Sequence, residues 1–183
     1  MLSEIQRQQL HELARHAIEF GLEHGRPPEI NITDFDTELQ QNSATFVTLH
    51  RHNQLRGCIG ILQPLRPLAE DVVQNAWAAA FSDTRFMPLA RNELEALDIH
   101  ISILGTPETI IFDSESDLVQ QLRPGVDGLI LEDGYHRGTF LPSVWEQLPS
   151  RHEFFRHLKQ KAGLPPDYWS DTLTVQRYTV EEF

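Results

Sequence analysis

One order of predicted elements, a β-hairpin followed by a helix and then a strand, occurs twice along this chain. Apolar runs on either side of a short polar turn indicate each hairpin, and apolar residues at three- and four-residue spacing indicate each helix. Arg56-Gly57 in the first hairpin is matched 81 residues later by Arg137-Gly138 in the second. This repetition favours an internal duplication and an α+β fold. The predicted elements are hairpin 44–62, helix 67–82 and strand 98–104, then hairpin 128–141, helix 150–162 and strand 173–180.

The residues before the first repeat predict a helix and a connector. Ser3, with Gln6 three residues later, fits a capping box, and Gly25 followed by two prolines ends the helix. The stretch 26–43 is rich in Pro, Asn and Asp, which indicates an extended connector. At 183 residues the chain suits a single domain, in which residues 1–43 form the helix and connector and 44–112 and 127–183 form the two repeated subdomains.

Charge and cysteine content narrow the classes of function. The formal net charge of −12 argues against nucleic-acid backbones and anionic membrane surfaces as partners, since both attract basic proteins. A single cysteine excludes an intrachain disulfide and a Cys-rich zinc site. The N-terminus is polar, and no apolar run is long enough to span a bilayer. We therefore expect a cytoplasmic protein.

The segment Leu55–Gly60 contains that cysteine, Cys58, with a glycine two residues after it and another directly before it. Gly57 and Gly60 allow another group to approach the backbone closely. Arg56 and Cys58 share one face of a regular strand, where a guanidinium would favour the reactive thiolate. If His52-Asn53 form the turn, Val47 lies opposite Cys58 and Leu49 opposite Arg56. The alternative is a buried structural cysteine in a closely packed strand.

Further candidate ligand-binding residues follow the first repeat's helix. Asp83 and Arg85 lie in a turn-rich segment, where side chains commonly line clefts. Arg56 and Arg85 could together hold a carboxylate or phosphate through bidentate hydrogen bonds. In the alternative interpretation Asp83 and Arg85 pair with each other or cap the helix. Thr48 and Asn75 are candidates to orient a ligand by hydrogen bonding.

A catalytic cysteine needs a base, and the sequence does not identify one. The available imidazoles are His50 and His52 near the first hairpin tip, His100 on the polar face of its strand, and His136 in the second hairpin. None forms a recognisable Cys-His signature. No metal-binding or cofactor-binding motif occurs either, so we expect neither a metal nor a cofactor.

Several motifs in chain order resemble the AMMECR domain family. The similarity extends from about Ala44 to the C-terminus, and the N-terminal helix fits too. It implies an α+β fold whose curved, largely antiparallel, barrel-like sheet is built from two duplicated units, with flanking helices and a cleft. The motifs are Leu55–Gly60, Asp83–Phe86, Ile99–Leu104, Phe140–Trp145 and Lys161–Leu164 before Trp169. The chain departs from the pattern at Ser143, where many relatives would have Gln.

The resemblance does not bring an established reaction. It implies, as partners by genomic context, a Memo-like protein and a radical-SAM protein. Two hypotheses therefore remain. One is a binding or adaptor module whose cleft around Arg56–Cys58 and Asp83–Arg85 holds a small anionic ligand or a partner's segment. The other is a thiol-dependent enzyme with Cys58 as its nucleophile.

Overall fold

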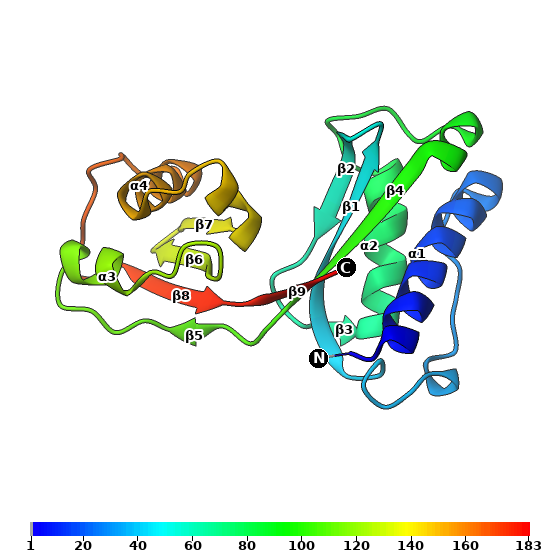
Figure 1. The fold of residues 1–183 in the computed structure, drawn as a ribbon, viewed down its shortest axis with the longest axis horizontal. Coiled ribbons are helices and arrows are strands. Elements are labelled where there is room, and N and C mark those ends of the chain that lie inside the picture. Colours follow the sequence, from blue (N-terminus) through cyan, green and yellow to red (C-terminus); the bar gives the residue numbers. More distant parts are fainter. Residues whose placement is uncertain (1) are drawn as a thin grey trace. The chain divides into compact units, whose positions relative to one another are not determined.

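The computed structural model describes residues 2–183, and the chain divides into two compact units (Figure 1). The first unit runs to Leu104 and includes Glu181–Phe183, and the second is Gly105–Val180. Within the described residues the strands form two separate sheets. In the first, the order is β2 (Gln54–Gly60), β1 (Asn42–Arg51), β4 (Leu97–Leu104) and β9 (Val180–Glu182), with β3 (Arg66–Pro67) paired to β1. In the second, the order is β5 (Glu108–Thr109), β8 (Thr174–Tyr178), β6 (Gly128–Asp133) and β7 (His136–Phe140). All the pairings with a determined register are antiparallel. The predicted α+β class and the N-terminal helix are confirmed. The strands expected in one barrel-like sheet are divided between the two.

The first unit contains two long helices on one face of its sheet. Ser3 caps α1 and forms the predicted capping box with Gln6, and Gly25 ends the helix in a left-handed conformation. The connector holds one short 3-10 turn. The elements are α1 (Glu4–His24), η1 (Ile32–Asp34), β1 (Asn42–Arg51), β2 (Gln54–Gly60), β3 (Arg66–Pro67), α2 (Leu68–Phe81), η2 (Arg91–Ala96), β4 (Leu97–Leu104) and β9 (Val180–Glu182).

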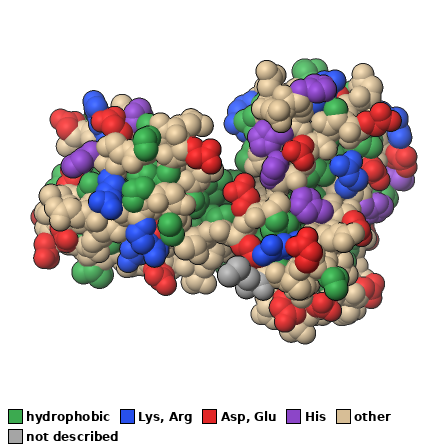
Figure 2. All heavy atoms as spheres, in the orientation of Figure 1, with side chains coloured by type: hydrophobic (Ala, Val, Ile, Leu, Met, Phe, Trp, Pro, Cys, Tyr) green, Lys and Arg blue, Asp and Glu red, His purple; other side chains and the backbone are tan. Residues whose placement is uncertain are grey.

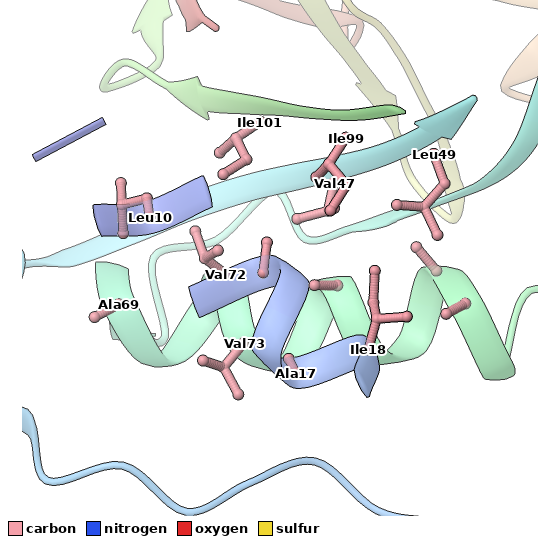
Figure 3. Packing of buried hydrophobic residues seen from close by; sticks show 14 of the residues in the cluster. Leu10, Ala17, Ile18, Val47, Leu49, Ala69, Val72, Val73, Ile99 and Ile101 are labelled. Atoms are coloured by element: carbon pink, nitrogen blue, oxygen red, sulfur yellow. The ribbon is translucent and has the colours of Figure 1, made fainter. Parts of the chain in front are cut away.

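Apolar side chains from α1, α2 and the sheet meet in the core of the first unit. Figure 3 shows Leu10 and Ile18 of α1 and Val72 of α2 packed beneath Val47 and Ile101 of the sheet. All five side chains are fully buried. Their removal from water is the main stabilising contribution to this unit. Because alternate strand residues point to opposite faces, the other face of β1 carries Thr48 and the residues two positions before and after it.

The second unit repeats the pairing pattern of the first. Hairpin β6–β7 is followed by α4, and β8 then pairs with β6, as β4 pairs with β1. The stacked rings of Trp145 and Phe154 lie in its core, 3.7 Å between centroids. The elements are β5 (Glu108–Thr109), α3 (Glu115–Gln121), β6 (Gly128–Asp133), β7 (His136–Phe140), η3 (Pro142–Glu146), α4 (Arg151–Lys161) and β8 (Thr174–Tyr178).

The C-terminal strand differs from the sequence prediction. The predicted strand 173–180 is interrupted at Thr179, and β8 and β9 belong to different sheets. Backbone hydrogen bonds between Ile101 and Phe183 hold the chain end beside β4. A continuous apolar-polar alternation cannot reveal such a change of sheet, because both strands have the same period.

The surface mixes charges of both signs. Figure 2 shows acidic, basic and histidine side chains interspersed on the visible face, without a continuous basic field. None of the helices formed by residues 2–183 combines the length and the apolar character that crossing a membrane requires.

Candidate functional site

The first hairpin places Cys58 through a β-bulge. His52 and Asn53 adopt positive φ angles of 53° and 61°, as a tight two-residue hairpin turn requires, so the predicted turn is confirmed. His50 pairs with Leu55, but Leu49 pairs with Gly57, which leaves Arg56 as the extra residue. The bulge therefore shifts the register by one position.

This shift gives Cys58 a polar neighbour. Thr48, and not Val47, lies across from Cys58, so the predicted register is wrong by one residue. The Thr48 hydroxyl lies 3.1 Å from the Cys58 sulfur, and either group can donate the hydrogen bond. Gly57 faces α2, so the Cys58 side chain points to the opposite, helix-free face of the sheet. It is partly buried there.

Asp83 caps the edge of β2 at Cys58. Strand β2 is an edge strand, and its Cys58 N–H donates to Asp83 Oδ2 at 2.9 Å. The Asp83 side chain is 5% exposed, and both of its oxygens accept hydrogen bonds from Arg85. The hydrogen bonds from the Arg85 guanidinium, together with the Cys58 and Arg85 backbone N–H groups, hold the pKa of Asp83 well below its usual range although burial opposes this. Asp83 is therefore a charged, fixed support for the Cys58 backbone.

Arg85 is held by Asp83 and remains accessible. Its Nε and Nη2 donate to Asp83 at 3.0 and 2.7 Å, and Nη2 also lies 3.4 Å from the Cys58 carbonyl oxygen. The hydrogen bond to Asp83 raises the pKa of Arg85 further. The side chain is 55% exposed, and Nη1 makes no hydrogen bond to any residue in 2–183. The Asp83–Arg85 pairing, our alternative interpretation, is what the structure shows, and it leaves one side of the guanidinium available.

Arg56 is committed to a different partner. Its Nε and Nη2 donate to the two oxygens of Glu93 at 2.8 and 2.9 Å, and Nη2 donates to the Met87 carbonyl at 2.9 Å. The side chain is 14% exposed. The hydrogen bonds and charge of Arg56 lower the pKa of Glu93 to about 2. The expected pairing of Arg56 with the thiol is absent among the described contacts, because the bulge directs the guanidinium to Glu93.

The two glycines serve packing within the protein. A Cβ on Gly57 would collide with the Ala79 carbonyl of α2, and a Cβ on Gly60 would collide with Phe46 and the Thr45 carbonyl. The close approach predicted at both glycines is therefore made by the protein's own groups, and their assignment to ligand binding stays a prediction.

Asn75 lies on the other face of the sheet from Cys58. It is 3% exposed, and its amide nitrogen donates to the Thr45 carbonyl, the Thr45 hydroxyl and Asp71. Asp71 also accepts from Arg66, so these residues form a buried network that joins α2 to β1. Asn75 thus joins helix to sheet, and its predicted role in orienting a ligand at Cys58 gains no support from its position.

Two histidines lie on the same polar face as Cys58. Thr48 pairs with Cys58 on one side and with His100 on the other. The His100 ring lies edge-on to His50 at 5.1 Å, and its Nε2 is 3.2 Å from Asp98. Strand β1 lies between Cys58 and His100, so their backbones are two strand spacings, roughly 10 Å, apart. The two residues are therefore not directly paired.

The other candidate imidazoles have partners or positions of their own. His52 occupies the hairpin turn, and His136 belongs to the second unit, where its Nδ1 is 3.1 Å from the Ala162 carbonyl oxygen. Across the part of the chain that the structure describes, no three His, Cys, Asp or Glu side chains are grouped to hold a metal ion. The geometry supports an exposed guanidinium beside a partly buried thiol.

Glu93 and Asp98 were not predicted from the sequence. Glu93 lies 37 residues from Arg56, and no local pattern links them. Asp98 could have been found from its position two residues before His100 on one strand face.

Comparisons with known proteins give a consistent family match. A family model described as AMMECR1 matches residues 11–183. A protein from Thermococcus onnurineus is 41% identical over 185 residues, which cover 93% of this chain and 86% of that protein. Protein MJ0810 from Methanocaldococcus jannaschii is 35% identical over 163 residues, covering 85% of this chain and 79% of that protein. The crystal structure of the uncharacterized protein PH0010 from Pyrococcus horikoshii matches with a TM-score of 0.86 and 37% identity, covering 94% of this chain and 88% of that one.

Proposed function

The chain belongs to the AMMECR1 family, and from the geometry beside Cys58 we propose that it is a binding module. Its ligand is a small anion or the carboxylate of a partner's segment. The anion binds the exposed side of the Arg85 guanidinium, next to Cys58 and Thr48. The observation that carries this proposal is the half-exposed Arg85, fixed by buried Asp83 with its Nη1 without a partner among the described residues.

Preorganisation explains why this arginine suits the role. Most of the side-chain entropy that binding would remove is already lost, because Asp83 holds the guanidinium in a bidentate geometry. The Phe86 ring, 5.5 Å from the guanidinium carbon, adds a cation–π contact. Asp83 carries the same negative charge as the anion, but its carboxylate is shielded from solvent behind Arg85, so the anion meets the guanidinium first. Arg56 contributes less, since Glu93 compensates its charge.

A thiol-dependent enzyme is the second candidate. Its support is the contact of Cys58 with Thr48 on a face that also carries His50, His100 and Asp98. The absence of any imidazole contact to the sulfur within residues 2–183 makes binding the better supported function. In both cases we place the protein in the cytoplasm, where a partly exposed thiol stays reduced. The partner segment would come from a protein encoded with it, a Memo-like or a radical-SAM protein.

The test uses inorganic phosphate and citrate as probes. Titration of each into ¹⁵N-labelled protein should shift the Arg85 Nε–H and Cys58 amide signals saturably. Arg85→Gln should weaken this binding at least about tenfold, the loss expected for one charge-assisted interaction. Arg91→Gln is the matched control, because Arg91 is also exposed, at 68% against 55% for Arg85, and pairs with surface residue Glu23. Unchanged signals in the wild-type protein, or equal binding by Arg85→Gln, would overturn the proposal.

Cys58→Ser separates the two candidates. A serine hydroxyl can keep the hydrogen bond to Thr48, so binding of the two probes should change by less than about threefold. If Cys58→Ser abolishes the protein's function in cells but leaves binding of the two probes intact, the result would favour the enzyme.

A further inference from the structure

The outer edge of β4, in the first unit, is only partly paired. Strand β9 lies next to β4, and Ile101 of β4 exchanges two backbone hydrogen bonds with Phe183, at 2.9 and 3.1 Å. The pairing of β4 with β1 on its other side is regular throughout, so every second residue of β4 directs its main-chain groups away from β1. Ile99, two residues before Ile101, therefore also has an outward N–H and an outward C=O.

The outward groups of Ile99 have no hydrogen-bond partner among residues 2–183. The next outward residue, Leu97, is satisfied within the protein, because its N–H donates to the Leu94 carbonyl and its carbonyl accepts from Arg15 Nη2 at 3.3 Å. Ile99 is 6% exposed, and buried main-chain groups of folded proteins are nearly always paired. The edge of β4 thus has a gap of one residue, which suits a ligand with one donor and one acceptor.

A cavity of about 310 Å³ lies at this gap, between β4 and one face of α1. Its volume is at the lower end of the range for ligand pockets. Burial and the nearby His100 lower the pKa of His11 in its wall, so the His11 ring is neutral at neutral pH. The lining residues are Asp98 and Ile99 of β4 and Gln8, His11, Glu12 and Arg15 of α1.

Phe183 shows which kind of side chain fits between α1 and this edge of β4. Its ring lies edge-on to His11, 5.4 Å between centroids, and the Arg7 guanidinium carbon is 5.6 Å from the ring centroid. Arg7 and His11 are four residues apart on α1, and His11 and Arg15 repeat that spacing one turn further on, where they line the cavity. Ile99 likewise follows the position of Ile101 by one strand repeat. The cavity therefore repeats the surroundings of the Phe183 ring, without a ring in it.

We propose that this cavity binds an aromatic side chain carried by an extended segment of a partner protein. The N–H and C=O of the aromatic residue pair with the C=O and N–H of Ile99, as strand addition requires, and its ring enters between His11 and Arg15. Arg15 forms no ion pair within the described chain, so its guanidinium can make a cation–π contact with the ring. This site lies on the β4 side of the sheet, whereas the anion site at Arg85 lies at the β2 edge.

The experiment uses the full chain and a defined probe, N-acetyl-L-tyrosine N-methylamide, which is one aromatic residue with an amide on each side. Titration into ¹⁵N-labelled protein should shift the Ile99 amide and His11 ring signals saturably and leave the Cys58 amide signal unchanged. The corresponding alanine compound should bind at least about tenfold more weakly, since it has no ring to bury. An unperturbed Ile99 amide at tens of millimolar probe, or equal binding of the alanine compound, would overturn the proposal.

Two comparisons isolate the main-chain and side-chain contacts. Methylation of the tyrosine amide nitrogen of the probe removes the donor to the Ile99 carbonyl and should abolish binding to the wild-type protein. Arg15→Gln should weaken binding of the unmodified probe about threefold, the loss expected for one exposed cation–π contact. Arg26→Gln is the matched control, because Arg26 lies 5.3 Å from the Phe20 ring and does not line this cavity. Full binding of the methylated probe would refute the pairing with Ile99, and equal affinities of the two variants would refute the placement of the ring.

Discussion

The carboxylate of Asp83 accepts the backbone N–H of Cys58 across a 2.9 Å hydrogen bond, 25 residues away in sequence. This contact satisfies an edge-strand donor that would otherwise be open to pairing with another chain. It also places the Asp83–Arg85 ion pair directly beside the only cysteine. One buried carboxylate thus connects the end of α2, the edge of the sheet and the exposed guanidinium of the candidate site.

Replacement of Asp83 should destabilise the first unit. Asp83→Asn keeps the shape but turns an amide donor toward Arg85, so we expect a loss of about 2 kcal/mol in the free energy of unfolding. Urea denaturation followed by tryptophan fluorescence measures the loss. Asp167→Asn is the control, because Asp167 is exposed and makes no described hydrogen bond. Equal stability of the two variants would show that the cap is not stabilising.

Acid should weaken the fold through Glu93. The pKa of Glu93 is lowered from an ordinary value of 4.5 to about 2, so the folded protein binds this proton less tightly than the unfolded chain. The stabilisation is therefore complete above pH 4.5 and is lost as the pH falls toward 2. Glu93→Gln should lower stability at pH 6 by at most about 3 kcal/mol and flatten the dependence below pH 5. The free energy of unfolding is measured between pH 2 and 6 for both proteins. If it fell in parallel for the variant and the wild type, this assignment would be contradicted.

Deletion of Arg56 should leave Cys58 in place. The hairpin β6–β7 also has a two-residue turn, but no bulge, and keeps Gly138 opposite Leu131, the counterpart of Gly57 opposite Leu49. The shortened β2 should therefore still pair Cys58 with Thr48, detected as cross-strand NOEs between them. Stability should fall by about 3 kcal/mol, because Glu93 loses its main partner. A contact between Cys58 and Val47 in the deletion variant would refute the role assigned to the bulge.

The hairpin glycines should differ in their tolerance of a methyl group. A Cβ at Gly57 would collide with the Ala79 carbonyl, which belongs to rigid helix backbone, whereas a Cβ at Gly138 would lie 3.0 Å from its nearest neighbours in Ala162. Gly57→Ala should lower stability by more than about 3 kcal/mol, and Gly138→Ala by about 1 to 2 kcal/mol. Thermal unfolding compares the two variants. The reverse order would mean that α2 can move away from its sheet more readily than α4.

Sequence periodicity determined most of the elements of both units. The capping box at Ser3, the hairpin turn at His52-Asn53 and the repeated order of hairpin, helix and strand depend on neighbouring residues, so local pattern was enough to predict them. The short elements α3, β5 and η3 were not predicted, since they have too few residues to establish a period.

The tertiary structure decided the details of the candidate site. The sequence brought Cys58, Asp83 and Arg85 forward by residue type, but the partner of Arg56 is Glu93, 37 residues away, and the cap at Cys58 depends on where α2 ends against the sheet. The position of Asn75 on the far face, and the packing of Gly57 against Ala79, depend on the same contact between helix and sheet. A periodic pattern specifies which residues share a face. Which partner a charged side chain finds is set by long-range packing, because ion pairs and edge caps form between segments that only the folded chain brings together.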